Sequence, residues 1–380
     1  MNILFVHPNL SRYASKQIRA LSKESGIETY LLCGHPDVSV YNMDDLRKIC
    51  REVRPDLPVL RYPYQYRSVA RQIASLVHEW EIDVVNVYSM PDDLAVAAIE
   101  ADAAPVVYSL RDITSTFSSE LLASRVFPEW LVSRRWMGAV PRYLVSRYIR
   151  SMEKQAMEQS QARVYSTPCM LRYAREHYDV DDNNLVFLNY ILQEELPGVE
   201  KEKRSETEGG THIGFAGNID IHDTYRNFLP FFIAVAKEKI HVHMHVVAKD
   251  EASKQACRRA AERYAHLHYY PPMSPSDVIA ALTAYDFGIL PFHTERGYYD
   301  NILPNKLFDY LAAGLPIVSS PVKCLRQFIE DNEVGFVYHD AAELASMLRS
   351  TDPAAYKVER STFLMENHID SLINLFTQIA

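Results

Sequence analysis

Short apolar runs alternate with amphipathic stretches twice along this 380-residue chain. Unbroken apolar runs predict buried strands, and apolar positions spaced three and four apart predict helices. The expected strands are 3–6, 29–32, 84–87, 106–108, 163–165, 212–215, 241–247, 267–270, 287–290, 317–319 and 335–337. The expected helices are 67–80, 92–101, 225–238, 251–265, 275–284, 303–313 and 322–330. This alternation indicates α/β structure with parallel sheets covered on both faces, as two doubly wound, Rossmann-like domains.

A polar segment separates the two halves of the pattern. Residues 193–211 are charged, contain glycine and show no apolar period, which is typical of an exposed linker. Residues 357–379 carry apolar side chains at helical spacing, so a helix there needs a surface on which to bury its stripe. We therefore expect a first domain over 1–192, a second over 193–355 and a terminal helix in 356–380.

Composition narrows the class of protein. The net charge of −9 argues against nucleic-acid binding. No apolar run approaches the ~18 residues of a membrane-spanning helix. The N-terminus reads as a strand and not as a signal peptide, and the five cysteines are scattered without close pairing. These features favour a cytoplasmic protein with reduced thiols and no structural zinc.

The stretch 301–319 is the most informative of the chain. Apolar residues at helical spacing are ended by Gly314 and Pro316, and a buried strand follows. Lys306 and Asp309 lie three apart, on one face near the helix N-terminus. That end of a helix presents free N–H groups and a positive dipole, which suits a phosphate. A surface helix with one ion pair would give the same pattern.

The run LPNKLFDYLAAGLPIVSS resembles the nucleotide-sugar-binding segment of GT-B glycosyltransferases, specifically the retaining family-4 (group 1) enzymes. In that family a Glu, seven residues and a second Glu precede the YLAAG run. Asn301 stands at the first Glu position and Asp309 at the second. The resemblance implies that Asp309 binds the donor ribose beside Asn305 and Lys306. It also makes Asn301, a neutral amide, a catalytic residue that contacts the sugar. It further implies that the terminal helix in 356–380 packs back on the first domain.

Residues 83–113 resemble the same family up to its His-Asp turn, which here is Arg111-Asp112. Carboxyl ends of strands in a doubly wound sheet face the ligand crevice, so Asp112 is a catalytic candidate. Its other reading is a helix cap, because Asp is favoured at that position. Asp92 and Asp93 are expected to cap the helix that begins near Leu94.

The run GFAGNID at 214–220 resembles the turn that holds the donor phosphates in GT-B enzymes, where Gly217 would admit close backbone approach. The cations usual in the family are absent, since Asn218 and Asp223 stand in their places. Buried phosphates need positive charge, and Lys306 is the first candidate replacement. The candidate donor-binding residues are Gly217, Asn218, Arg226, Lys249, Met273, Asn305, Lys306 and Asp309.

Two further patterns have alternative interpretations. His241, His243 and His245 share one strand face, which fits either packed core histidines or a metal site, and we expect no metal. Residues 122–154 interleave arginines with aromatic residues in an otherwise acidic chain. That pattern fits either contact with an anionic membrane surface or an ordinary helix with an exposed basic side.

The resemblance implies a hexosyltransferase that uses a nucleoside diphosphate sugar, with UDP expected, and no other cofactor. The acceptor would be a hydroxyl of a glycan or lipid-linked saccharide, contacted by residues 9–13, 89–92 and 111–114. Metal-independent transfer with retention is expected, in the cytoplasm or on the inner face of the membrane. Two alternatives stay open. One is a UDP-sugar 2-epimerase-like GT-B enzyme, and the other is a catalytically inactive GT-B subunit that scaffolds a partner.

Overall fold

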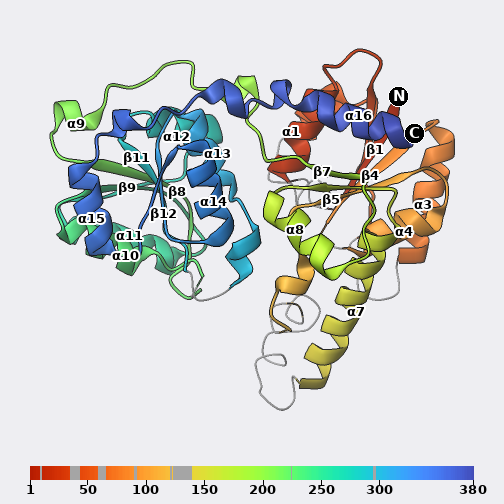
Figure 1. Ribbon diagram of the computed structural model, residues 1–380, viewed down its shortest axis with the longest axis horizontal. Helices are drawn as coiled ribbons and strands as arrows, with labels where there is room; N and C mark the ends of the chain where they lie inside the picture. Colours follow the sequence, from red (N-terminus) through yellow and green to blue (C-terminus); the bar gives the residue numbers. More distant parts are fainter. Residues whose placement is uncertain are drawn as a thin grey trace. The chain divides into compact units, whose positions relative to one another are not determined.

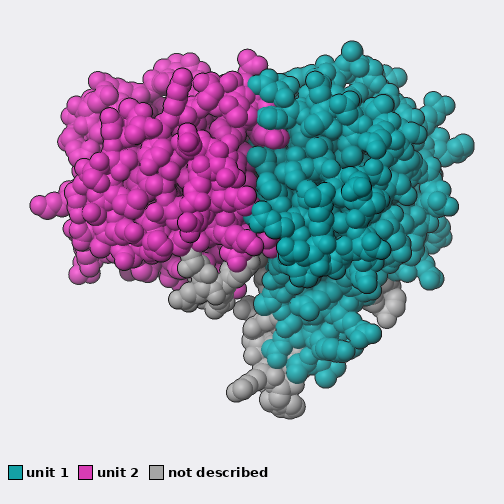
Figure 2. Space-filling model, viewed as in Figure 1, with its two compact units in different colours: residues 1–189, 365–380 teal, residues 190–364 magenta. Residues whose placement is uncertain are grey.

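The computed structural model describes residues 1–8, 11–34, 43–58, 66–89, 92–119, 122, 139–223, 225–293 and 297–380. The chain forms two compact units (Figure 2). Unit 1 comprises Met1–Asn189 with Met365–Ala380, and unit 2 is Tyr190–Leu364. The sequence placed the two junctions at 192/193 and 355/356, whereas the compact units meet at 189/190 and 364/365.

Unit 1 contains a seven-stranded parallel sheet in the order β3-β2-β1-β4-β5-β6-β7 (Figure 1). Its strands are β1 (Asn2–His7), β2 (Glu28–Cys33), β3 (Glu52–Arg54), β4 (Val84–Tyr88), β5 (Val106–Leu110), β6 (Ala162–Tyr165) and β7 (Asn184–Val186). Its helices include α1 (Arg12–Leu21), α2 (Met43–Ile49), α3 (Tyr66–Glu79), α4 (Asp93–Ala101), α7 (Ala139–Gln159) and α8 (Pro168–His177). The edge strands β3 and β7 escape sequence prediction because each has three residues and no buried apolar run.

Unit 2 contains a six-stranded parallel sheet in the order β10-β9-β8-β11-β12-β13. Its strands are β8 (His212–Ile219), β9 (His241–Ala248), β10 (Leu267–Tyr270), β11 (Phe287–Leu290), β12 (Ile317–Ser319) and β13 (Gly335–Val337). Its helices are α9 (Arg204–Thr207), α10 (Leu229–Lys237), α11 (Glu251–Arg263), α12 (Pro275–Leu282), α13 (Asn305–Ala312), α14 (Lys323–Asn332) and α15 (Ala341–Ser350). Figure 1 shows α10, α11 and α15 on one face of this sheet and α12 to α14 on the other. Two doubly wound α/β domains are thereby confirmed.

Helix α13 lies tightly on its sheet. The buried Tyr310 hydroxyl donates to the Ile289 main-chain oxygen at 3.0 Å and accepts from the Ala216 N–H at 3.1 Å. A Cβ at Gly288 would lie 2.4 Å from the Tyr310 ring, so only glycine admits this approach. One tyrosine therefore ties α13 to both β8 and β11.

The two segments near the unit junctions pair with each other. Ile191 forms a parallel bridge with Leu364, and its N–H donates to the Phe363 oxygen at 2.9 Å. The terminal helix α16 (Ile369–Ile379) belongs to unit 1 and packs against α1 and β7, as the sequence predicted. The expected length of that helix is wrong, because the 3-10 turns Arg360–Phe363 and Met365–Asn367 precede it.

The expected capping role of Asp92 is also wrong. Asp92 is the N-cap residue of α4, but its side chain makes no capping hydrogen bond. Its Oδ1 instead accepts a hydrogen bond from the buried Tyr108 hydroxyl at 2.6 Å. The carboxylate thereby joins α4 to β5 and does not satisfy the helix terminus.

Candidate functional site

The strand order of unit 2 reverses between β8 and β11, and ligands in doubly wound sheets bind at such a switch point. Gly217 and Asn218 lie there, within β8. The sequence placed them in a turn, which is wrong because β8 stays in register with β9 as far as the Ile219–Ala248 pair. The ladder holds these residues in extended backbone at the carboxyl edge of the sheet.

Lys306, in the first turn of α13, lies directly against Gly217. A Cβ built on Gly217 would lie 2.8 Å from the Lys306 Nζ. Glycine therefore leaves the space that the amine occupies, and a positive group is set beside the exposed backbone of β8. This contact joins the two candidate donor-binding segments, 214–220 and 301–319.

Three phenylalanine rings surround the same amine. The Lys306 Nζ lies 4.3 Å from the ring centre of Phe215, 5.5 Å from that of Phe228 and 5.3 Å from that of Phe292. All three rings are buried. Lys306 makes no hydrogen bond or ion pair with any residue in the described ranges. The amine is thus available to a ligand.

Desolvation dominates the electrostatics of Lys306. Burial, the largest cause, and the nearby Arg226 together lower its pKa to about 7, against the opposing effect of Asp309. Arg226 is itself exposed, and its Nε lies 3.9 Å from the Asp223 carboxylate. Arg226 therefore adds positive potential beside Lys306, but part of its charge is offset by Asp223.

Lys249 is bound to a protein carboxylate. Its Nζ lies 2.9 Å from Asp220 Oδ2, and this hydrogen bond lowers the pKa of the Asp220 carboxyl. A phosphate would have to compete with Asp220 for this lysine. Of the three candidate cations, Lys306 alone lacks a carboxylate within 4.0 Å among the residues described.

An exposed edge extends from Gly217 across the neighbouring strands. Asn218 pairs in register with Val247 of β9, and both side chains are exposed. Val247 is 52% exposed, and Met273, which follows β10, is 39% exposed. These exposed apolar side chains lie at the carboxyl ends of β9 and β10, the two strands that flank β8 on one side of the sheet.

The remaining unit 2 candidates lie around α13. Asn305 is exposed in its first turn, and Asp309 is partly buried one turn further. Asn301 is partly buried at the end of the 3-10 turn Gly297–Asn301 that precedes the helix. The structure therefore gathers Gly217, Lys306 and the start of α13 at one edge of the unit 2 sheet.

Asp112 lies in the other unit, so its surroundings are described separately. It follows β5 and is partly buried. The neighbouring Arg111 N–H donates to the Ser89 Oγ at 2.9 Å, which connects the ends of β4 and β5. Of the expected acceptor residues, 9, 10, 90 and 91 lie outside the described ranges.

Unit 1 also contains buried carboxyl groups, among them those of Asp93 and Glu153. Burial and the nearby Asp92 raise the pKa of Asp93 to about 7. Burial also raises the pKa of Glu153, whose carboxyl accepts from the Ser115 N–H at 2.6 Å. Glu153 thereby joins α7 to η2 (Thr114–Thr116), and α4, which carries Asp93, packs against α7.

The histidines of β8 to β10 form a hydrogen-bonded network in the sheet of unit 2. His212 Nδ1 lies 2.9 Å from His243 Nε2, and His245 Nε2 lies 2.8 Å from the Tyr285 hydroxyl. His241 Nδ1 lies 3.0 Å from His268 Nε2. The described residues contain no cluster of His, Cys, Asp or Glu arranged to hold a metal ion. Most of the ring nitrogens bond within this network, whereas His245 Nδ1 is buried without a hydrogen-bond partner in the described ranges.

Helix α7 has an exposed apolar end. Figure 1 shows this end extending away from the unit 1 sheet. Val140, Tyr143 and Leu144 are 65%, 61% and 58% exposed, and Arg147 lies one turn beyond them. Of the basic-aromatic segment, residues 123–138 lie outside the described ranges. No helix in the parts of the chain that the structure describes is long and apolar enough to cross a membrane.

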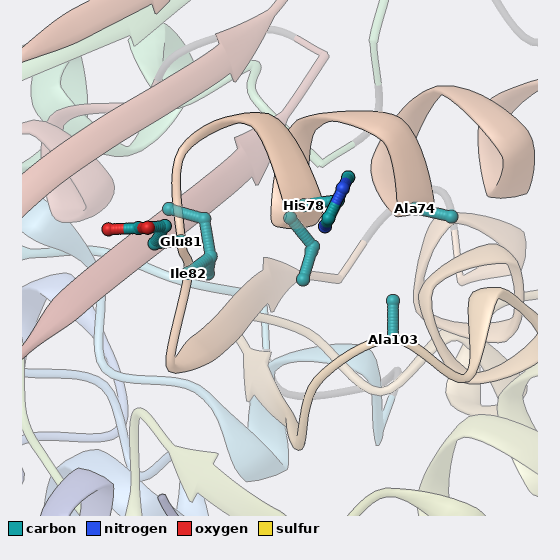
Figure 3. Close-up of a pocket in the computed structure, with 6 residues that line it drawn as sticks. Ala74, His78, Glu81, Ile82 and Ala103 are labelled. Atoms are coloured by element: carbon teal, nitrogen blue, oxygen red, sulfur yellow. The ribbon is translucent and has the colours of Figure 1, made fainter.

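A hollow of about 410 Å³ lies elsewhere in unit 1 (Figure 3). It is lined by Ala74, Val77, His78, Glu81, Ile82 and Ala103. These residues end α3 or precede β4 and β5, so the hollow lies at the amino edge of the strands, opposite the edge that binds ligands. Figure 3 shows the Glu81 carboxylate pointing away from Ala103.

Sequence reasoning missed the phenylalanines around Lys306. Phe215 is visible only as one residue of an apolar strand, and Phe228 and Phe292 only as apolar residues near element ends. Their convergence depends on the pairing of β8 with β11. One of the three could have been found from the sequence, because Phe228 lies two residues after the candidate cation Arg226.

Two family models match the chain. The model described as Glycosyltransferase Family 4 matches residues 10–188, and the model described as Glycosyl transferases group 1 matches residues 210–351. The first match falls within unit 1 and the second within unit 2. Together they span most of both units. No curated protein matches the chain.

Solved structures share the fold along the whole chain. Sucrose-phosphate synthase from Thermosynechococcus elongatus is 13% identical, with a TM-score of 0.67, over 100% of this chain and 98% of that one. HepE from Anabaena, solved with UDP and glucose, is 12% identical with a TM-score of 0.67 over 100% of both chains. A putative UDP-N-acetylglucosamine 2-epimerase from Listeria monocytogenes is 10% identical, with a TM-score of 0.59, over 98% of this chain and 94% of that one. At such identities the likeness shows the fold alone, and that fold is GT-B.

Proposed function

Because this chain belongs to the group 1 glycosyltransferases with the GT-B fold, we propose that it transfers a hexosyl group from a UDP-sugar to a hydroxyl acceptor. The observation that carries the donor assignment is the Lys306 amine. It lies against Gly217 at a topological switch point, with no protein carboxylate as its partner in the described ranges. The UDP bound in HepE supports UDP as the nucleotide to test first.

Each candidate residue has a role in this proposal. Lys306 and the free N–H groups of α13 bind the diphosphate and stabilise its negative charge as it leaves the sugar. Asp309 accepts hydrogen bonds from the ribose hydroxyls. Asn218 and Met273 border the nucleoside, and Asn301 contacts the sugar. Arg226 and Lys249 supply further positive potential, although carboxylates accompany both.

The proposed transfer retains the anomeric configuration and uses no metal. A cationic side chain and a helix N-terminus can stabilise a departing diphosphate without one. Asp112 and the end of β5 provide acceptor contacts from unit 1. We further propose that the acceptor is carried on a lipid, which the exposed apolar end of α7 and its arginines support.

The first test is a thermal-shift screen of UDP, GDP, ADP, CMP and dTDP sugars, followed by titration. Lys306→Ala should weaken nucleoside diphosphate binding by about 10–100-fold, since a hydrogen bond to a charged group contributes roughly 1.5–3 kcal/mol. Its affinity for the bare nucleoside should stay the same. Lys237→Ala, an exposed lysine on α10, is the control. Equal loss for both ligands would remove Lys306 from the diphosphate site.

Turnover separates the alternatives. UDP release that requires an acceptor supports transfer, whereas conversion of a UDP-sugar without an acceptor supports an epimerase. Binding without turnover on any acceptor would support an inactive scaffold subunit. The last alternative is favoured by one observation, the amide of Asn301 at a position where the family carries Glu.

A further inference from the structure

Lys306 is partly buried as a whole residue, and its amine lies among three aromatic rings with no hydrogen-bond acceptor in the described ranges. An ammonium has three N–H donors, and in water all three are satisfied. The faces of Phe215, Phe228 and Phe292 attract a cation but do not replace those hydrogen bonds. Within the described part of the chain no other group bonds to this amine. The geometry therefore favours loss of the proton as long as no anion is bound.

The charged groups around the amine do not reverse this preference. Among the described residues, the titratable groups on the surrounding elements are Asp309 and Tyr310 of α13, Asp223 and Arg226 before α10, His293 after β11, and Tyr299. Asp309 favours the charged amine, Arg226 disfavours it, and burial has the largest effect. Together they leave the pKa of Lys306 at about 7, far below that of an exposed lysine.

We propose that Phe215, Phe228 and Phe292 are positioning residues that hold the Lys306 amine neutral against Gly217, and that the donor diphosphate draws a proton onto it when it binds. The proton comes from solvent and adds to the Nζ lone pair, and the ammonium then donates hydrogen bonds to phosphate oxygens. This inference rests on the proposed function, since it names how that same site is regulated.

Proton-coupled binding would give the site a definite selectivity. A neutral amine has little attraction for a passing carboxylate, whereas a diphosphate supplies enough negative charge to recruit the proton. The affinity for the donor should be highest below pH 7. It should fall by up to tenfold per pH unit as the pH rises above the pKa of the free amine. Binding of the bare nucleoside should show no such slope.

The test is isothermal titration of UDP-glucose at pH 8 in two buffers of different ionisation enthalpy. The diphosphate of a nucleotide sugar is a diester with no group that titrates near neutrality, so any proton taken up belongs to the protein. We expect uptake close to one proton at pH 8 and much less at pH 6. Binding without uptake at pH 8 would overturn the proposal.

Variants separate positioning from a merely structural role. Lys306→Arg keeps a charge that does not titrate in this range, so it should bind without proton uptake. Phe228→Leu should admit water to the amine and reduce uptake at pH 8, whereas a purely structural defect would lower affinity equally at every pH. Lys237→Arg is the matched control, because that exposed lysine lies 5.7 Å from the Tyr264 ring.

The protonation state of Lys306 can also be measured in the ligand-free protein, so this test does not require that the donor binds. Competitive acylation read by mass spectrometry should show half-maximal reactivity of Lys306 near pH 7. A midpoint near that of Lys237 would refute the proposal even if UDP-glucose does not bind. Failure of every nucleotide sugar to bind would instead refute the proposed function, so the two failures are distinguishable.

Discussion

Arg360 donates a hydrogen bond from Nη2 to the main-chain oxygen of Ala313, 2.9 Å away, and so satisfies the last turn of α13. The same guanidinium donates from Nη1 to Glu200 Oε1 at 2.5 Å. Gly314 follows in the left-handed region with φ +72°, where a Cβ would lie 2.5 Å from Arg360 Nη2. The helix that carries Lys306 in its first turn is thus held at its other end by a residue close to the 364/365 junction.

Arg360→Met should destabilise unit 2 by about 1–2 kcal/mol, because a partly buried carbonyl loses a charged donor. Nucleoside diphosphate affinity should fall several-fold as α13 loosens. Urea unfolding and ligand titration measure the two effects. Arg326→Met, which removes only an exposed pair with Glu330, should change neither. Equal behaviour of the two variants would show that the Ala313 contact contributes nothing.

Tyr310→Phe should cost about 1–3 kcal/mol of unfolding free energy. The change leaves the buried Ala216 N–H without its acceptor while keeping the ring in place. We also expect weaker donor binding, because the hydroxyl is the polar link from α13 to β8 and β11. Tyr264→Phe, on a less buried ring, provides the comparison. A Tyr310→Phe protein with wild-type stability would contradict this account of how α13 is held.

Gly217→Ala should reduce donor affinity at least tenfold with a smaller effect on stability. The new Cβ would displace the flexible end of Lys306, which is easier to move than backbone, although φ of +156° adds some strain. Gly198→Ala is matched, since a Cβ there meets nothing within 4 Å. Unchanged affinity in Gly217→Ala would mean that the amine does not need its observed position.

The two units should respond to acid in opposite directions. In unit 2 burial lowers the pKa of His241 and of His245 to about 4 and lowers that of His243 further. The neutral histidines contribute their full stabilisation of folded unit 2 above pH 6.5, and this contribution is lost as pH falls toward 4. In unit 1 the raised pKa of Asp93, about 7, means stabilisation that is complete below pH 4 and is lost as pH rises through 7.

Between pH 7.5 and 5.5 we therefore expect unit 2 to lose roughly 2–3 kcal/mol, from the buried His243 and His245. Unit 1 should gain about 1–2 kcal/mol, because the buried acids Asp93 and Glu153 outweigh the buried His7, whose pKa burial lowers to about 3. Tryptophan fluorescence during urea unfolding reports unit 1 selectively, because residues 190–364 contain no tryptophan. A tryptophan introduced at Phe231 reports unit 2. Parallel shifts of both transitions would contradict the assignment.

The end of α7 should bind anionic lipid. Each arginine near such a surface contributes about 1 kcal/mol, and exposed apolar side chains add insertion. Flotation with vesicles containing phosphatidylglycerol should recover the protein at low salt and less of it at high salt. Val140→Glu with Leu144→Glu should abolish flotation, whereas Val199→Glu, at a 77% exposed position of unit 2, should not. A protein that never floats would remove the support for a lipid-linked acceptor.

Local signals explain what the sequence predicted well. Pro304, Gly314 and Pro316 act on their own neighbours, so the existence and the end of α13 are confirmed to within a few residues. Continuous apolar strands likewise reveal parallel sheets without knowledge of their partners. The alternation of strands and helices then predicts two doubly wound domains, whereas the strand order that sets the switch point at β8 and β11 comes from the structure.

Non-local contacts explain the rest. The ladder with β9, and not the glycine content of 214–220, decides that β8 continues to Ile219. The pairing of Lys249 with Asp220 joins residues on neighbouring strand ends, which no short motif encodes. The phenylalanines around Lys306 come from three separate segments, so their shared function emerges only when the sheet forms.

The bridge between Ile191 and Leu364 makes unit 2 an insertion whose two ends are adjacent. A segment whose two ends are adjacent can be replaced as a whole, since both of its junctions with the rest of the chain lie side by side. Residues 190–364 would then be the natural unit to swap among relatives that prefer different sugars. The protein that receives the foreign unit 2 would keep its own α16, because the residues after 364 belong to unit 1.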